Sequence, residues 1–406
     1  MSHQIIFPKD LTGKLYDVYK ELRELQTPYF YENYTSNKNI PGVWLIACYD
    51  MCVEVSKNTK TIIKTNTLDP AKANILDEFM LSTDGLKHKR LRALISKQFS
   101  YRSTTEHETM ITNTVQSYIN NINSRTGEEI DFVQEFAGSL PLEIIADVIG
   151  FRKNKLTEIR RASLIICDFL DSFVANTYSD EQHLSALNTF VEIINKEITY
   201  IKNQVTSNKT ICKSDMSISQ GLVLDFFDNT ISDTELTAMF MFLMFAGHET
   251  TTNLLSSALY LLLKHPEQLN LLINQPDLIP SCVEEVLRFE SPEQRGTFRM
   301  TTEELVINDV TIPKDSQISV LLGSANRDEK VFTSADVFDI TRHPNRHIAF
   351  GYGAHNCLGQ HLSRLELQVF LREIMPLLPN IQLACEPHWR QDTFFRGLSA
   401  LPIIIS

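Results

Sequence analysis

The stretch Phe350-Gly351-Tyr352-Gly353-Ala354-His355-Asn356-Cys357-Leu358-Gly359 decides the fold of this chain. It places one cysteine, Cys357, on a glycine-rich loop directly before an apolar helical pattern. Glycine permits backbone conformations that a side chain forbids. Backbone N–H groups and the positive end of a helix favour an anionic sulfur. The sequence therefore predicts a metal-binding loop in which Cys357 is the ligand and Phe350 shields one side of it.

A long apolar pattern from Asp233 to Lys264 is the second strong feature of the sequence. At about 1.5 Å per residue, a helix of this length would run for more than about 40 Å. One short segment, 246–251 (Ala-Gly-His-Glu-Thr-Thr), interrupts the pattern. We predict a locally opened helix in which the Thr250 hydroxyl bonds the Ala246 carbonyl four residues earlier. A simple kink with capped hydroxyls is the alternative, and the central polar residues disfavour a membrane span.

Both motifs resemble those of the cytochrome P450 superfamily, the heme-thiolate monooxygenases. The Cys357 loop has the phenylalanine, two glycines, basic residue, cysteine and glycine of that family's heme-binding loop. Segment 246–251 resembles the family's Ala-Gly-x-(Asp/Glu)-Thr motif. The resemblance covers about residues 83–400 and implies a mainly α fold with small β-sheets, in a single large domain over 1–406. It also implies heme b, iron protoporphyrin IX, between a long central helix and the cysteine loop with its proximal helix.

The resemblance implies a role for individual residues of these motifs. Cys357 would be the axial ligand of the heme iron, a ligand that favours cleavage of the O–O bond. Thr250 would hydrogen-bond the O2 that enters the opened helix, and Glu249 would face water as part of a proton relay. The implied heme contacts are His88, Arg92, Ala246, Arg299, Phe350, His355, Cys357 and Gly359.

Two cationic side chains, His88 and Arg92, are four residues apart in a helical segment and therefore share one face. In the family this helix contacts a heme propionate, so the resemblance implies that role here. A solvated basic face is the other interpretation of the spacing alone. Arg299 and His355 match the family's remaining propionate contacts.

Glu285 and Arg288 are three residues apart in a helical segment, a spacing that usually indicates a surface ion pair. It resembles the family's Glu-x-x-Arg motif, in which the pair is buried with a second arginine. Arg342 occupies the place of that second arginine. The resemblance therefore implies a structural lock, in which removal of one partner would leave buried charge unpaired.

A candidate substrate pocket follows from the segment before Arg299. Residues two apart share a face in an extended strand, so Arg295 would lie on the same inward side as Arg299. A buried charge needs an anion or a strong acceptor, which predicts a substrate with an apolar body and a carboxylate or carbonyl group. A twisted strand that carries Arg295 to solvent or to a propionate is the alternative. The predicted pocket residues are Arg295, Thr297, Phe298, Thr393 and Phe394.

Composition and charge exclude several other classes of protein. The 406 residues contain no evident linker or repeat, and 43% hydrophobic with 22% charged residues is typical of a globular protein. A net charge of −12 argues against nucleic acid as the main partner. Seven scattered cysteines indicate a reducing compartment. Residues 1–11 show neither a signal-peptide nor a membrane-anchor pattern, so we expect a cytoplasmic protein of the bacterial type.

We expect an enzyme that uses O2 and electrons to oxidise, most simply to hydroxylate, a lipophilic small molecule in secondary metabolism. Two alternatives are a peroxide-driven peroxygenase and a heme-binding sensor without turnover. The acid–alcohol pair Glu249-Thr250 disfavours both. The substrate itself is not readable from the sequence.

Electrons would come from an acidic ferredoxin and its reductase. Complementary charge raises association rates, and positive residues cluster around the proposed heme face. An ordinary solvated surface is the alternative interpretation. The residues of this cluster are Lys87, Lys89, Arg90, Lys97, Arg342 and Arg346.

Overall fold

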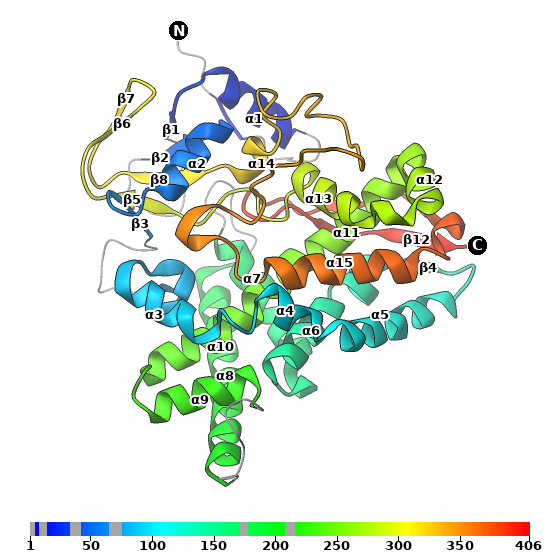
Figure 1. Ribbon diagram of the computed structural model, residues 1–406, viewed down its shortest axis with the longest axis horizontal. Helices are drawn as coiled ribbons and strands as arrows, with labels where there is room; N and C mark the ends of the chain where they lie inside the picture. Colours follow the sequence, from blue (N-terminus) through cyan, green and yellow to red (C-terminus); the bar gives the residue numbers. More distant parts are fainter. Residues whose placement is uncertain (1–4, 8–13, 33–41, 65–74, 171–177, 208–215) are drawn as a thin grey trace.

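Two helices, α10 (Asp233–Ala246) and α11 (Glu249–Lys264), follow one another through the middle of the molecule (Figure 1). Ser232 caps α10 by accepting a bond from the backbone of Glu235, whose side chain returns the bond. The predicted interruption of the long helix is confirmed, because Gly247 and His248 separate the two helices. The computed structural model describes residues 5–7, 14–32, 42–64, 75–170, 178–207 and 216–406.

Gly247 is required at the interruption for a packing reason. A Cβ atom there would come within 2.6 Å of Ile145 Cγ1 and 2.8 Å of the Leu243 carbonyl. Only glycine therefore lets the helix that carries Ile145 approach α10 this closely.

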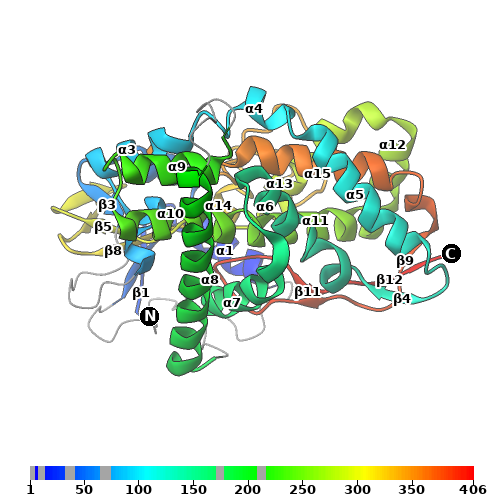
Figure 2. The same cartoon turned by 90° about the horizontal axis from the view of Figure 1, so that it is seen from below.

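Helices form most of the structure, and Figure 2 shows the long helix α8 crossing beside α10. The predicted mainly α fold is confirmed. The remaining helices are α1 (Leu15–Glu24), α2 (Tyr49–Lys57), α3 (Gly85–Ile95), α4 (Tyr101–Thr105), α5 (Glu108–Asn123), α6 (Leu140–Ile149), α7 (Leu156–Leu170), α8 (Asp180–Ser207), α9 (Ile218–Phe227), α12 (Pro266–Asn274), α13 (Ile279–Phe289), α14 (Leu322–Ala325) and α15 (Gln360–Ile374).

Small β-sheets lie at the edges of the helical body. The largest among the described residues has the strand order β1-β2-β8-β5-β3, in which β2 and β8 are parallel. The others have the orders β4-β12-β9, β6-β7 and β10-β11. The strands are β1 (Tyr29–Tyr31), β2 (Val43–Ile46), β3 (Ile62–Lys64), β4 (Glu129–Asp131), β5 (Arg299–Thr301), β6 (Leu305–Ile307), β7 (Val310–Ile312), β8 (Gln317–Val320), β9 (Ile381–Leu383), β10 (His388–Trp389), β11 (Leu398–Ala400) and β12 (Pro402–Ile405).

The main hydrophobic core surrounds α10 and α11. It takes side chains from α5, α6, α8, α13 and α15, while separate smaller clusters lie beneath β1, β2 and β8. Burial of this apolar surface is the main favourable term in folding. Within the described part of the chain, no helix is long and apolar enough to cross a membrane.

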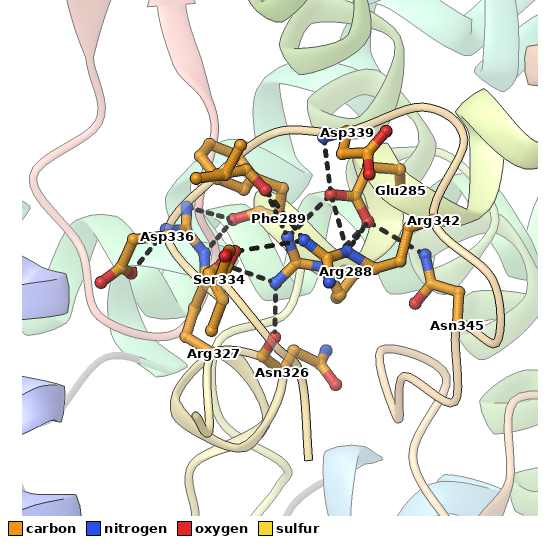
Figure 3. A network of polar contacts seen from close by, with 12 residues as sticks. Glu285, Arg288, Phe289, Asn326, Arg327, Ser334, Asp336, Asp339, Arg342 and Asn345 are labelled. Atoms are coloured by element: carbon orange, nitrogen blue, oxygen red, sulfur yellow. Dashed lines mark hydrogen bonds and ion pairs between the residues drawn. The ribbon is translucent and has the colours of Figure 1, made fainter. Parts of the chain in front are cut away.

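Glu285, on α13, is completely buried and accepts bonds from several donors (Figure 3). Arg288 donates Nε and Nη2 to its two carboxylate oxygens, each over 2.8 Å. Arg342 donates Nε at 3.1 Å to the Oε2 atom. The amide of Asn345 and the backbone N–H of Asp339 also donate to Glu285, each over 3.0 Å. The structure thus brings together the three residues of the predicted lock.

Candidate functional site

The Cys357 loop joins the irregular segment after α14 to helix α15. Its backbone is left-handed at Gly351, with φ of 70°, and at Gly353, with φ of 77°. A Cβ atom on Gly353 would lie 2.6 Å from the Ser56 carbonyl, so glycine is needed there for close approach to α2. The Cys357 N–H donates to the Phe350 carbonyl over 2.8 Å and closes the loop. The sulfur is thereby presented directly before α15.

Cys357 opens onto a large cavity of about 1380 Å³, part of which is open to solvent. The loop and the start of α15 form one wall, and the facing wall comes from α10 and α11. Thr250 lies on this second wall together with Leu243 and Ala246. Five side chains that can carry positive charge also line the cavity: Lys64, His88, Arg92, Arg299 and His355.

The anionic sulfur predicted from the sequence depends on more than the loop itself. Burial raises the pKa of its thiol to about 11, although the Gly359 N–H, Arg92 and Arg364 lower it. The loop donors alone therefore do not keep the sulfur anionic near neutral pH. A bound metal cation would supply the missing positive charge, because coordination deprotonates a thiol outright.

The chemistry of the cavity fits heme. His88 is buried, and its Nε2 atom has no hydrogen-bond partner in the described structure. Arg92 donates to the Asn356 carbonyl over 2.8 Å, so it both supports the cysteine loop and lines the cavity. Arg299 lines the same cavity. A flat ligand whose metal binds the Cys357 sulfur and whose carboxylates bind these three side chains would give every one of these groups a partner.

His355, a predicted propionate contact, has a partner that the sequence did not reveal. Its Nε2 atom lies 2.8 Å from Asp84 Oδ1, and its ring lies beside that of His88, with centroids 4.2 Å apart and the planes tilted by 33°. Burial lowers the pKa of His355 to about 4, against the opposing effect of Asp84. The imidazole is therefore neutral near pH 7. Its contact with a propionate stays a prediction.

Three consecutive hydroxyls of α11 point in three directions. Thr250 donates to the Ala246 carbonyl over 3.1 Å, which is the bond predicted from the sequence. Thr251 also lines the cavity and lies 3.5 Å from the Ser363 hydroxyl of α15. Thr252 donates to the Ala137 carbonyl over 2.9 Å, away from the cavity. Thr250 is thus held at the opened turn.

The expectation that Glu249 faces water is wrong. Its side chain is only 4% exposed and lies 3.0 Å from Arg390 and 3.1 Å from His248. Burial alone would raise the pKa of this carboxyl, but His248 and Arg390 outweigh burial and lower it to about 2. Arg390 is held in turn by Asp392 over 2.9 Å. Nothing in the local sequence pairs Glu249 with Arg390, which lies 141 residues away.

The placement predicted for Arg295 is also corrected. Residues 291–298 form an irregular segment, and β5 starts only at Arg299, so alternation along an extended strand does not apply. Arg295 is completely buried and donates to the Leu170 carbonyl over 3.0 Å. Its guanidinium lies over the rings of Phe298 and Phe394, at 4.7 and 4.9 Å.

Of the predicted pocket residues, only Thr297 lines the cavity that contains Cys357. Arg295, Phe298, Thr393 and Phe394 are absent from its walls. Three acidic or basic residues of this cavity were missed: Lys64, Glu293 and Glu366. Burial raises the pKa of Glu293 and, more strongly, that of Glu366. No local pattern marks these residues, since their burial follows from the packing of distant elements.

The predicted basic surface is smaller than expected. Lys87 pairs with Glu78 and Arg90 with Glu235, each over 2.5 Å. Arg342 is bound to Glu285 in the lock. The members that remain exposed are Lys89, Lys97 and Arg346.

Comparisons with known proteins agree with this geometry. A family model described as Cytochrome P450 matches residues 12–378. A "Cytochrome P450" of Bacillus subtilis (strain 168) is 34% identical over 96% of this chain and 93% of its own length. A "Biotin biosynthesis cytochrome P450" of the same organism is 34% identical over 89% of this chain and 90% of its length. Among solved structures, P450BioI in complex with an acyl carrier protein that carries hexadec-9Z-enoic acid superposes on this chain with a TM-score of 0.84. The two sequences are 31% identical, and the match covers 97% of this chain and 99% of that one.

Proposed function

The chain belongs to the cytochrome P450 family of monooxygenases, and we propose that it uses O2 and electrons from an acidic ferredoxin to hydroxylate a lipophilic small molecule. One observation carries the proposal: Cys357 and Thr250 lie on walls of the same cavity. A sulfur ligand and a hydroxyl group on one cavity are the two protein groups that the family's motifs supply for oxygen activation. In this proposal the heme is heme b.

Heme, when bound, supplies the oxidising chemistry. Cys357 provides its sulfur ligand, and His88, Arg92 and Arg299 hold its carboxylates by charge-assisted hydrogen bonds. The Thr250 hydroxyl, kept at the opened turn by the Ala246 carbonyl, passes a proton into the cavity. The apolar side chains of α10 exclude water around the reacting groups.

Glu249 is proposed as the acid of the proton relay, with a condition that the ion pair imposes. Its carboxylate is ionised and bound to Arg390 and His248. It can pass on a proton only when Arg390 separates from it and water reaches the carboxylate. Because Glu249 and Thr250 are adjacent, they face different sides of α11. The relay therefore connects the side of α11 next to Arg390 with the cavity.

Thr250→Ala is expected to uncouple electron use from product formation. Without the hydroxyl, proton delivery becomes disordered while electron entry is unchanged, so product per electron should fall roughly tenfold or more and peroxide should rise. The measurement compares NAD(P)H consumed with product and peroxide formed. Thr252→Ala is the matched control, since its hydroxyl bonds Ala137 away from the cavity. An unchanged ratio of product to electrons in Thr250→Ala would contradict the role of Thr250.

We place the reaction in the biosynthesis of secondary metabolites. Support comes from the names of relatives, among them a "Polyketide biosynthesis cytochrome P450 PksS" that is 29% identical over 89% of this chain. The mainly apolar cavity wall on α10 suits a lipophilic substrate. A cytoplasmic location is part of the proposal, and the free thiols of the described cysteines agree with a reducing compartment.

Reduction by an acidic ferredoxin is expected to depend on the three exposed cations of the basic surface. Reversing Lys89, Lys97 and Arg346 to glutamate should lower the reduction rate by about tenfold at low salt and remove most of its salt dependence. Stopped-flow reduction across a range of ionic strengths measures this. The control reverses three other exposed cations, Lys20, Arg161 and Lys314. Equal effects of both triple variants would rule out docking at the proposed surface.

A further inference from the structure

Two cations lie directly opposite each other across a pair of strands. Strands β3 and β5 are antiparallel, and Lys64 is the register partner of Arg299. Each residue is only 8% exposed. Like charges that face each other on neighbouring strands destabilise a sheet, and burial increases the cost. This arrangement therefore calls for a compensating negative charge.

Among the described residues, the direct hydrogen-bond partners of the two side chains are neutral groups. The Lys64 ammonium donates to the hydroxyl of Thr297 and, over 3.4 Å, to its carbonyl, while Arg299 donates to the same carbonyl over 3.3 Å. Asp84 accepts a bond from the backbone N–H of Lys64 rather than from its ammonium, and its other oxygen faces His355. No carboxylate of the described chain forms an ion pair with either cation within 4.0 Å.

Two acids, Glu293 and Asp84, act on the pair electrostatically and raise the pKa of both Lys64 and Arg299. Glu293 lines the same cavity and interacts electrostatically with Lys64 and Arg299. Burial raises the pKa of Glu293, although Lys64 and Arg299 lower it. Burial and then Arg299 lower the pKa of Lys64, against the opposing effect of Glu293 and Asp84. Within the described structure neither cation is bonded directly by a carboxylate, and an anion bound in the cavity would supply that bond.

Both cations line the cavity onto which Cys357 opens. The anion that they bind should therefore belong to the ligand of that cavity. We propose that Lys64 and Arg299 together clamp one carboxylate of the bound heme, with the Thr297 hydroxyl positioning the Lys64 ammonium. The inference rests on heme binding by the family. It adds Lys64 to the predicted heme contacts and moves Thr297 from the substrate to the cofactor. A carboxylate held from both strands would convert a repulsive cross-strand pair into a favourable one.

The test uses Lys64→Met, which keeps most of the length of the side chain and removes its charge. Loss of heme to an excess of apomyoglobin should become about 10- to 100-fold faster, as expected for a lost hydrogen bond to a charged group. The apo-protein should unfold at the same or a higher temperature than wild type, because the repulsion with Arg299 is gone. A purely structural Lys64 would instead lower the unfolding temperature of the apo-protein. That result, or heme loss at the wild-type rate, would overturn the proposal.

Two further arms identify the carboxylate. Lys89→Met removes an exposed charge from α3 and should leave heme loss unchanged. With heme dimethyl ester, wild type and Lys64→Met should lose the cofactor at equal rates, and a persisting difference would overturn the clamp. If Lys64→Met instead weakens binding of a fatty acid but not of its methyl ester, with normal heme loss, the carboxylate belongs to the substrate and the cofactor assignment is wrong. None of these readouts needs turnover, so they stand apart from the proposed hydroxylation.

Discussion

Cys357→Ser is expected to reduce monooxygenase activity to background while the protein keeps part of its heme. A serine hydroxyl is a much weaker electron donor than a thiolate, and strong donation to iron is what favours O–O cleavage. Heme retention should be partial rather than lost, because His88, Arg92 and Arg299 still face its carboxylates across the cavity.

The measurement is the absorption spectrum of the reduced protein under carbon monoxide. The red-shifted band that a thiolate ligand produces should be absent in Cys357→Ser. Cys385→Ser is the matched control, because Cys385 is an exposed thiol far along the chain from the loop. Retention of the red-shifted band by Cys357→Ser would show that another residue is the ligand.

Glu285→Gln is expected to lower the free energy of unfolding by about 3–5 kcal/mol, the usual cost of removing one partner of a buried ion pair. Glutamine keeps the shape of the side chain but leaves the buried Arg288 without its bidentate carboxylate (Figure 3). Arg342 loses the same partner. Denaturant unfolding of the apo-protein and of the heme-loaded protein measures the loss.

The neighbouring residue offers a control for this prediction. Glu284 binds Arg364 and His347, but its side chain is 28% exposed, so solvent can replace those partners. Glu284→Gln should therefore cost clearly less than Glu285→Gln. Adding Arg342→Met to Glu285→Gln should recover part of the stability, because it removes one of the stranded charges. Equal losses for the two glutamine variants would mean that the buried network is not a lock.

Several features of this protein follow from the sequence because they depend on short separations along the chain. The bond from Thr250 to Ala246 and the pairing of Glu285 with Arg288 are set by helix geometry, which brings residues three and four apart together. The interruption at Gly247 follows from a glycine within an apolar helical pattern. The Cys357 loop follows in the same way from its glycines, two of which adopt left-handed backbone conformations.

Only the tertiary structure decided the contacts between distant segments. Glu249 contacts Arg390 instead of water, because a segment near the C-terminus covers that side of α11. Arg295 does not line the cavity, because the residues before β5 do not form an extended strand. The register of β3 and β5 sets Lys64 opposite Arg299. Burial, which also raises the pKa of Cys357, is a property of the assembled core. Local spacing specifies which residues share a face, whereas the surroundings of that face are determined by packing of the whole chain.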